Sequence, residues 1–151
     1  MNAISAKDAT SALQSIIGCA FRFGIKSPDM DLYQIGFGED VVFINYFGNR
    51  QEASKYAIHF TCGLHLDWSD GKQIEYDSQS DAKTFHREIE SLIGLPVKTA
   101  EVLANNNVFI DLGLCKLEIV VREDGDESWR FFQPGQNRDH IVCCGKEISA
   151  Q

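Results

Sequence analysis

Three residues with metal-binding side chains lie close together in the sequence: His59, Cys62 and His65. Zinc prefers imidazole nitrogens and thiolates, so the H-x-x-C-x-x-H spacing is compatible with a zinc site. The surrounding residues alternate between apolar and polar, which predicts a strand, and residues three apart on a strand point to opposite faces. His59 and His65 would then share a face from which Cys62 is excluded. We therefore expect no bound metal and no other cofactor.

Two adjacent cysteines, Cys143 and Cys144, have side chains that could act as nucleophiles. They lack the C-x-x-C spacing and the helix N-terminus that lower the pKa of a redox-active thiol. No catalytic signature such as G-x-S-x-G or H-E-x-x-H occurs in the chain. The sequence favours a protein that is not an enzyme. The alternative is a small-molecule-binding protein or enzyme that uses a groove between two halves of the chain, with His59, His65 and His140 near it.

A short acidic segment, Glu123 to Glu127, contains the turn signal Asp124-Gly125 and predicts the tip of a hairpin. It lacks the D-x-D-x-D-G order of a calcium loop. An acidic tip can steer the approach of a basic protein. We expect contacts to a partner from four carboxylates and two exposed tryptophans: Glu123, Asp124, Asp126, Glu127, Trp68 and Trp129. Carboxylates at other turns would extend this surface: Asp29, Asp31, Glu39, Asp40, Asp67, Asp70, Glu75 and Asp77.

Composition and charge narrow the class of protein. The chain has 151 residues, 44% of them hydrophobic, and a formal net charge of −8, which predicts a single domain over residues 1–151 and opposes nucleic-acid binding. No apolar run is long enough for a membrane helix, and the N-terminus lacks an export signal. Four of the five cysteines lie in apolar runs, as reduced thiols do. We expect a cytoplasmic protein that binds no membrane.

Two stretches must form helices, and they resemble each other. Ile4–Gly18 and Ser80–Gly94 are separated by 76 residues and align without a gap. Each has a helix-capping residue, an apolar stripe at helical spacing and a closing glycine. The stripes are Ala9, Leu13, Ile16 and Ile17 in the first stretch and Phe85, Ile89, Leu92 and Ile93 in the second. Similarity continues into the following strands, so we predict two duplicated halves, about 4–79 and 80–151, related by an approximate two-fold axis.

The remaining residues predict short strands joined by turns. Leu32–Phe37 and Val41–Phe47 are expected to form a hairpin about Gly38, with Val41–Phe47 covered on both faces and Gly48–Lys55 as a loop. Tyr56–Trp68 is expected to be one strand with a bulge at Gly63. The other expected strands are 19–25, 73–76, 96–104, 108–112, 114–122, 128–132, 140–144 and 146–148. The predicted fold is α+β, mostly antiparallel, with two helices.

Two segments of the chain, Glu127–Pro134 followed by His140–Val142, and Tyr56–Cys62, resemble a group of small bacterial proteins that lack an assigned activity. Such proteins are suspected of being immunity proteins of contact-dependent or other polymorphic toxin systems. The resemblance covers about half of the chain. Trp129 and Arg130 match it, whereas Leu64-His65 replaces an expected Trp-Arg pair. It implies no catalytic residues.

The sequence thus predicts a non-enzymatic immunity protein that neutralises a toxin, a basic protein domain, by direct contact. A third possibility is a self-associating structural module, since exposed edge strands permit pairing between subunits.

Overall fold

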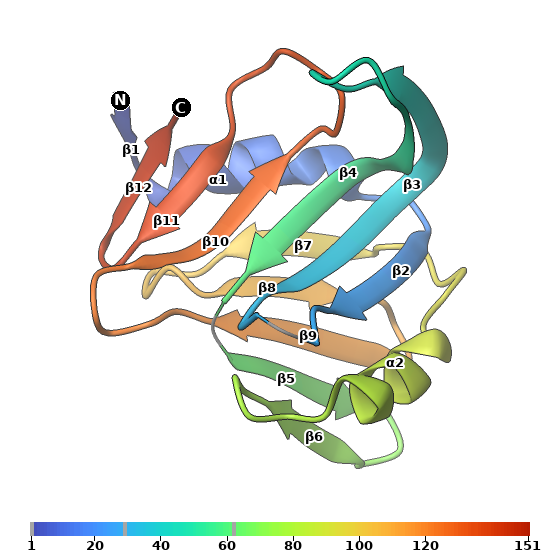
Figure 1. Cartoon of the computed structure of the whole chain (residues 1–151). Helices are drawn as coiled ribbons and strands as arrows, with labels where there is room; N and C mark the ends of the chain where they lie inside the picture. Colours follow the sequence, from blue (N-terminus) through green and yellow to red (C-terminus); the bar gives the residue numbers. More distant parts are fainter. Residues whose placement is uncertain (1, 29, 62) are drawn as a thin grey trace.

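The computed structural model describes residues 2–28, 30–61 and 63–151 (Figure 1). Asp29 of the expected acidic surface and Cys62 of the H-x-x-C-x-x-H segment lie outside these residues. No helix in the described part of the chain has the length and apolar character needed to cross a membrane.

Two antiparallel sheets make up most of the molecule, so the α+β prediction is confirmed. The first sheet has seven strands, in the order β1 (Asn2–Ile4), β12 (Glu147–Ala150), β11 (Ile141–Cys144), β10 (Glu127–Phe132), β4 (Arg50–Phe60), β3 (Tyr33–Ile44) and β2 (Phe21–Lys26). The second has five, in the order β6 (Gln73–Tyr76), β5 (Gly63–Trp68), β9 (Cys115–Val120), β8 (Val108–Asp111) and β7 (Thr99–Val102). The chain crosses between the sheets from β4 to β5 and from β9 to β10.

Three strand predictions are wrong. Residues 56–68 form two strands in different sheets, because the chain leaves the first sheet after Phe60. Leu32–Phe37 and Val41–Phe47 do not form a hairpin, because β3 continues through Gly38 as one strand with an irregular register between Phe37 and Asp40. The predicted loop over residues 48–55 is mostly strand, since β4 begins at Arg50 and pairs with the far end of β3.

Both predicted helices are present. The helix α1 (Ala6–Leu13) is followed by a 3₁₀ turn, η1 (Gln14–Ile16), and is capped by Ser5, whose hydroxyl accepts from the Asp8 backbone N–H. The helix α2 (Ala82–Glu90) is capped by Asp81 in the same way. The stripes are buried except for their last members: Ile17 and Ile93 are about half exposed, at 42% and 50%.

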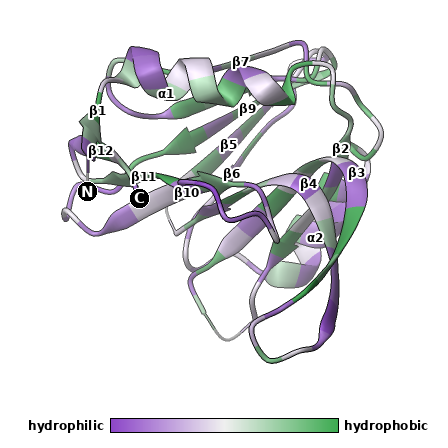
Figure 2. Cartoon of the chain, turned by 90° about the horizontal axis from the view of Figure 1, so that it is seen from above, coloured by the Kyte–Doolittle hydropathy of each residue, from purple (hydrophilic) through white to green (hydrophobic). Residues whose placement is uncertain are grey.

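The buried residues of both sheets and both helices form one hydrophobic cluster. Its largest fully buried side chains include Trp129, Tyr33, Phe21 and Phe85. Tyr33 stacks on Phe60 with ring centroids 5.0 Å apart and meets Phe85 edge-to-face at 4.9 Å. Figure 2 shows hydrophobic and hydrophilic residues alternating along the strands, as expected when one face of each sheet is buried and the other is solvated.

Each helix covers the edge of a sheet. Thr10 Oγ1 of α1 accepts from the Val102 backbone N–H (2.8 Å), and Gln14 Nε2 donates to the Ala100 carbonyl (2.7 Å), so polar groups at the edge of β7 have partners. His86 Nε2 of α2 accepts from the Lys26 backbone N–H of β2 (3.0 Å). Unpaired sheet edges are sites of unwanted association, and these contacts remove two of them. Figures 1 and 2 show the two helices on different sides of the molecule.

Candidate protein-binding surface

The strands β3 and β4 extend beyond the rest of their sheet as a two-stranded ribbon (Figure 1). Pairing of β2 with β3 ends at Phe37, and pairing of β10 with β4 ends at Ala57. From Asp40 to Ile44, β3 pairs only with β4 within the described residues. We call residues 38–55 the arm.

The end of the arm is a structured turn. Asn45 Oδ1 accepts from the backbone N–H groups of Phe47 (3.0 Å) and Asn49 (2.9 Å), and Gly48 has a φ of +80°, which favours glycine. The turn holds Tyr46 and Phe47 outward, at 97% and 81% exposure. Their rings meet edge-to-face with centroids 5.5 Å apart. Two aromatic side chains are thus held in solvent by a hydrogen-bonded turn.

The apolar surface continues along the arm. Val42 and Ile44 are 54% and 66% exposed, so the prediction that this segment is covered on both faces is wrong. The reason is that β2 and β10 end before the arm begins. Phe43 is half-buried and lies against Gly135, where a Cβ would overlap its ring. An exposed apolar patch of this kind marks a surface that contacts another molecule.

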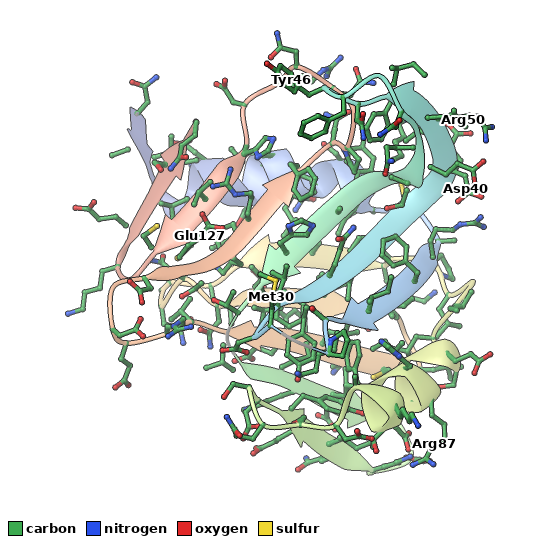
Figure 3. All side chains as sticks on the ribbon, viewed as in Figure 1. Met30, Asp40, Tyr46, Arg50, Arg87 and Glu127 are labelled. Atoms are coloured by element: carbon green, nitrogen blue, oxygen red, sulfur yellow. The ribbon has the colours of Figure 1, made fainter. Side chains whose placement is uncertain are left out.

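The base of the arm is hollowed on one side. A cavity of about 320 Å³ is lined by Phe23, Ile25, Gln34, Asp40, Glu52, Ala53 and Ser54. Asp40 pairs with Arg22 and Glu52 pairs with Arg50, each at 2.9 Å. These ion pairs are exposed, so they contribute little to stability and can exchange partners. Figure 3 shows Asp40 and Arg50 on the same side of the arm, with Tyr46 beyond them.

Three of the four carboxylates of the acidic hairpin tip lie within 4.0 Å of an arginine. Arg122 lies 2.6 Å from Asp124 and 4.0 Å from Asp126, and Arg130 lies 2.7 Å from Glu127. The hydrogen bond from Arg122 lowers the pKa of Asp124 and raises that of the guanidinium. Glu123 is exposed. Glu127 and Tyr46 lie far apart in Figure 3, so the tip and the arm are separate surfaces.

The two tryptophans differ in exposure. Trp129 is 2% exposed, and its indole Nε1 donates to the Asn106 carbonyl (2.9 Å). The expectation that Trp129 is an exposed anchor is wrong, because it points into the core while Arg130, its neighbour on β10, points out. Trp68 is half-buried, with the Lys72 ammonium 5.8 Å from its ring centroid.

Two of the three histidines expected near one groove lie together on the outer side of the seven-stranded sheet. His59 Nε2 bonds Gln34 Oε1 (2.8 Å), and His140 Nδ1 bonds Arg130 Nη1 (2.8 Å). The ring of Phe132 lies beside both, with centroids 4.7 Å from His59 and 4.9 Å from His140. Burial, followed by the Arg130 charge, lowers the pKa of both histidines. Both are therefore neutral at pH 7, and His140 Nδ1 accepts from Arg130.

The third histidine, His65, lies on β5 in the other sheet. It is 3.7 Å from Glu75 and lines a cavity of about 210 Å³ that also includes Phe109, Lys116 and Glu118. The three histidines are therefore not gathered in one site.

The described cysteines are free thiols. Burial raises the pKa of Cys115 to about 12 and that of Cys143 to about 11, so both are protonated at neutral pH and weak as nucleophiles. No group of three histidine, cysteine or acidic side chains among the described residues is arranged to hold a metal ion.

No protein-family model, curated protein or solved structure matches this chain. Of the residues of the arm, only Glu39 and Asp40 were among those expected to extend a partner-binding surface. A signal for them exists in the sequence: the strand that pairs with Val41–Ile44 begins Arg50-Gln-Glu52, which is too polar to be covered on both faces.

Proposed function

We propose that this chain is a non-enzymatic protein-binding module whose partner docks on the arm. The observation that carries the proposal is the exposure of Tyr46 and Phe47 on a turn fixed by hydrogen bonds. Burying such a side chain contributes about 1.5–3 kcal/mol, and a preformed turn loses little entropy on binding. Aromatic side chains of this kind are typical anchors of protein interfaces.

We further infer that residues 4–79 and 80–151 are diverged copies related by an approximate two-fold axis. Support comes from the segments after the helices, which pair with each other. Gly18 N–H donates to the Val97 carbonyl, and Gly94 N–H donates to the Phe21 carbonyl, both at 2.8 Å. The donors Gly18 and Gly94 are 76 residues apart, and so are the acceptors Phe21 and Val97, so the two bonds are equivalent under the proposed duplication. A second pair of bonds matches in the same way. The Val97 N–H donates to the Cys19 carbonyl (2.9 Å), and the Phe21 N–H donates to the Leu95 carbonyl (2.8 Å).

The contacts of the helices support the same inference. The backbone N–H of Val102 donates to Thr10, and that of Lys26 donates to His86. The same shift of 76 residues relates the two bonds. Gly38 and Gly113, which follow the matching strand segments, have φ angles of +87° and +86°.

The arm is where the two halves differ. At Gly113 the chain turns back at once, and Leu112 N–H donates to the Cys115 carbonyl (2.9 Å). At Gly38 it continues into the arm and returns only at Tyr56, which pairs with Phe37. Because the second half completes its strands without such an extension, the arm is not required to close the fold. We assign it to contact with a partner.

The partner that fits best is a basic toxin domain, which makes the chain a cytosolic immunity protein. The net charge of −8 favours encounter with a basic surface. Neutralisation by contact needs no nucleophile, which agrees with the protonated state of Cys115 and Cys143.

The test is binding of the purified protein to the toxin-like domain encoded beside its gene. We expect Tyr46→Ala and Phe47→Ala each to weaken binding about 30-fold, a loss of about 2 kcal/mol, while the unfolding free energy changes by less than about 0.5 kcal/mol. Leu114→Ala is the matched control, since Leu114 is 57% exposed but lies away from the arm in sequence and sheet. Equal binding by all three variants would remove the arm as the docking site.

One observation favours a second candidate, a small-molecule-binding protein or enzyme. His59 and His140 flank Phe132, and Arg130 holds the carboxylate of Glu127 beside them. A His59→Gln, His140→Gln double variant distinguishes the candidates. Toxin binding that the double variant keeps and the arm variants lose would favour the arm, whereas a wild-type protein that does not bind the toxin-like domain would favour this second site.

A further inference from the structure

We propose that the partner adds an extended strand to the free edge of β3 in the arm, so that binding extends the seven-stranded sheet. This inference rests on the proposed function and specifies how the arm is engaged. Strand addition supplies affinity through main-chain hydrogen bonds and specificity through alternate side chains.

Two of the sheet-edge strands, β7 and β2, are covered. Thr10 of α1 and Gln14 of η1 cover β7, and His86 of α2 covers the end of β2. From Asp40 to Ile44, by contrast, no helix or strand within residues 2–28, 30–61 and 63–151 pairs with the side of β3 that faces away from β4. The uncovered segment reads DVVFI, rich in residues with high β-propensity. An edge of this composition is a template for pairing with another chain.

The register of the arm shows which backbone groups are free. Asn45 N–H donates to the Asn49 carbonyl at the turn, and hydrogen-bonded pairs alternate along an antiparallel ladder. Phe43 and Gln51, two residues further on, are therefore also a hydrogen-bonded pair. The N–H and C=O groups of Asp40, Val42 and Ile44 consequently point away from β4, toward the free edge.

The side chains at this edge define the chemistry of the incoming strand. Val42 and Ile44 are two residues apart on β3, so they lie on one face of it. In the register of the two strands, Glu52 of β4 lies opposite Val42, and Ser54 lies opposite Asp40, which is two residues before Val42 on β3. A matching partner strand carries two apolar residues at alternate positions, followed two residues later by lysine or arginine opposite Asp40. Such a strand also complements the net charge of −8.

The first test compares Val42→Pro with Val42→Ala, using the toxin-like domain encoded beside the gene as the probe. Proline removes the outward N–H of Val42, which β4 does not use, and proline is tolerated at such edge positions. We expect Val42→Pro to weaken binding at least about tenfold more than Val42→Ala, which keeps the N–H. Equal affinities of the two variants would overturn strand addition.

The second test does not depend on a substitution. In the wild-type protein, amide hydrogen exchange at Val42 and Ile44 is expected to be fast without the probe and at least about 100-fold slower in the complex. Unchanged exchange at both residues would overturn the proposal. If Tyr46→Ala abolishes binding while these amides stay unprotected, the arm remains the docking site and only strand addition fails. If neither the arm variants nor the amides respond, the proposed function fails with it.

Discussion

His140 joins three parts of the chain through one imidazole ring. Its Nδ1 accepts from Arg130 on β10, its ring stacks on Phe132, and its backbone exchanges two hydrogen bonds with Gln151 at 2.7 and 2.8 Å. The charged groups around it are Arg130, Glu127 and Asp139. The segment that ends at His140 includes Gly135, which supports Phe43 of the arm.

The pKa of His140 lies below its ordinary value of 6.5, chiefly because of burial. The unfolded chain therefore takes up the proton first as the pH falls, and stability present above pH 6.5 is lost as the pH falls through the folded-state pKa. His59 contributes with the same sign. We expect His140→Gln to lose less unfolding free energy than the wild type between pH 7.5 and 5, because glutamine does not titrate in this range. Urea unfolding at several pH values measures this, and identical pH profiles would contradict it.

At the scale of elements, the arm and the turn at Gly113 are alternative ways of joining two strands. The turn needs only two residues, Gly113 and Leu114, between the hydrogen-bonded residues Leu112 and Cys115. The arm occupies residues 38–55 between the paired residues Phe37 and Tyr56. Few buried side chains lie in the arm, and its contacts with the rest of the chain include Phe43 with Gly135, Asp40 with Arg22, and the Gly38 N–H with the Ala20 carbonyl. From the proposed relation between the two halves, we expect the arm to be an addition to the sheet and not one of its structural supports.

Replacing residues 38–55 with Gly-Leu, the sequence of the turn at Gly113, tests this view. We expect the shortened protein to keep its far-ultraviolet circular dichroism and to lose no more than about 4 °C in thermal midpoint, equivalent to about 1 kcal/mol for a chain of this size. Binding to the toxin-like domain should be lost. A shortened chain that cannot fold would show that the arm is part of the structural framework.

Local signals in the sequence were enough for the elements that depend on local physics. The caps Ser5 and Asp81 and the buried stripes specified both helices, and the turn at Gly113 was predicted where it is found. Sheet membership was not predictable, because residues 56–68 alternate continuously through the point where the chain changes sheets. Exposure of Trp129 and of Val42 was misjudged because it depends on strands distant in sequence. The pairing of Arg122 with Asp124 was missed although the two residues are only two apart, in the turn between β9 and β10.

At the scale of the whole molecule, negative charge is spread over several surfaces. The acidic tip, the base of the arm and the outer side of the five-stranded sheet, with Glu75 and Glu118, all contribute to the net charge of −8. A distributed charge acts at long range and influences encounter more than the final contact.

We therefore expect salt to slow association with the basic domain by about tenfold between 0.05 and 0.5 M, with a much smaller change in dissociation. Stopped-flow mixing measures both rates. A Glu123→Gln, Asp126→Asn variant, which removes two exposed carboxylates, should depend less on salt. An association rate that does not change with salt would contradict charge steering.

Early segments of the chain pair with late ones, and this has a consequence during synthesis on the ribosome. The strand β4 borders β10, and α1 packs beside β7, so both early elements find their neighbours only after much more of the chain has been translated. A nascent chain that ends before Thr99 would expose both the apolar side of α1 and the edge of β4 that later pairs with β10. We therefore expect stable tertiary structure to form late, once translation has passed β10, and the incomplete chain to be prone to aggregation until then.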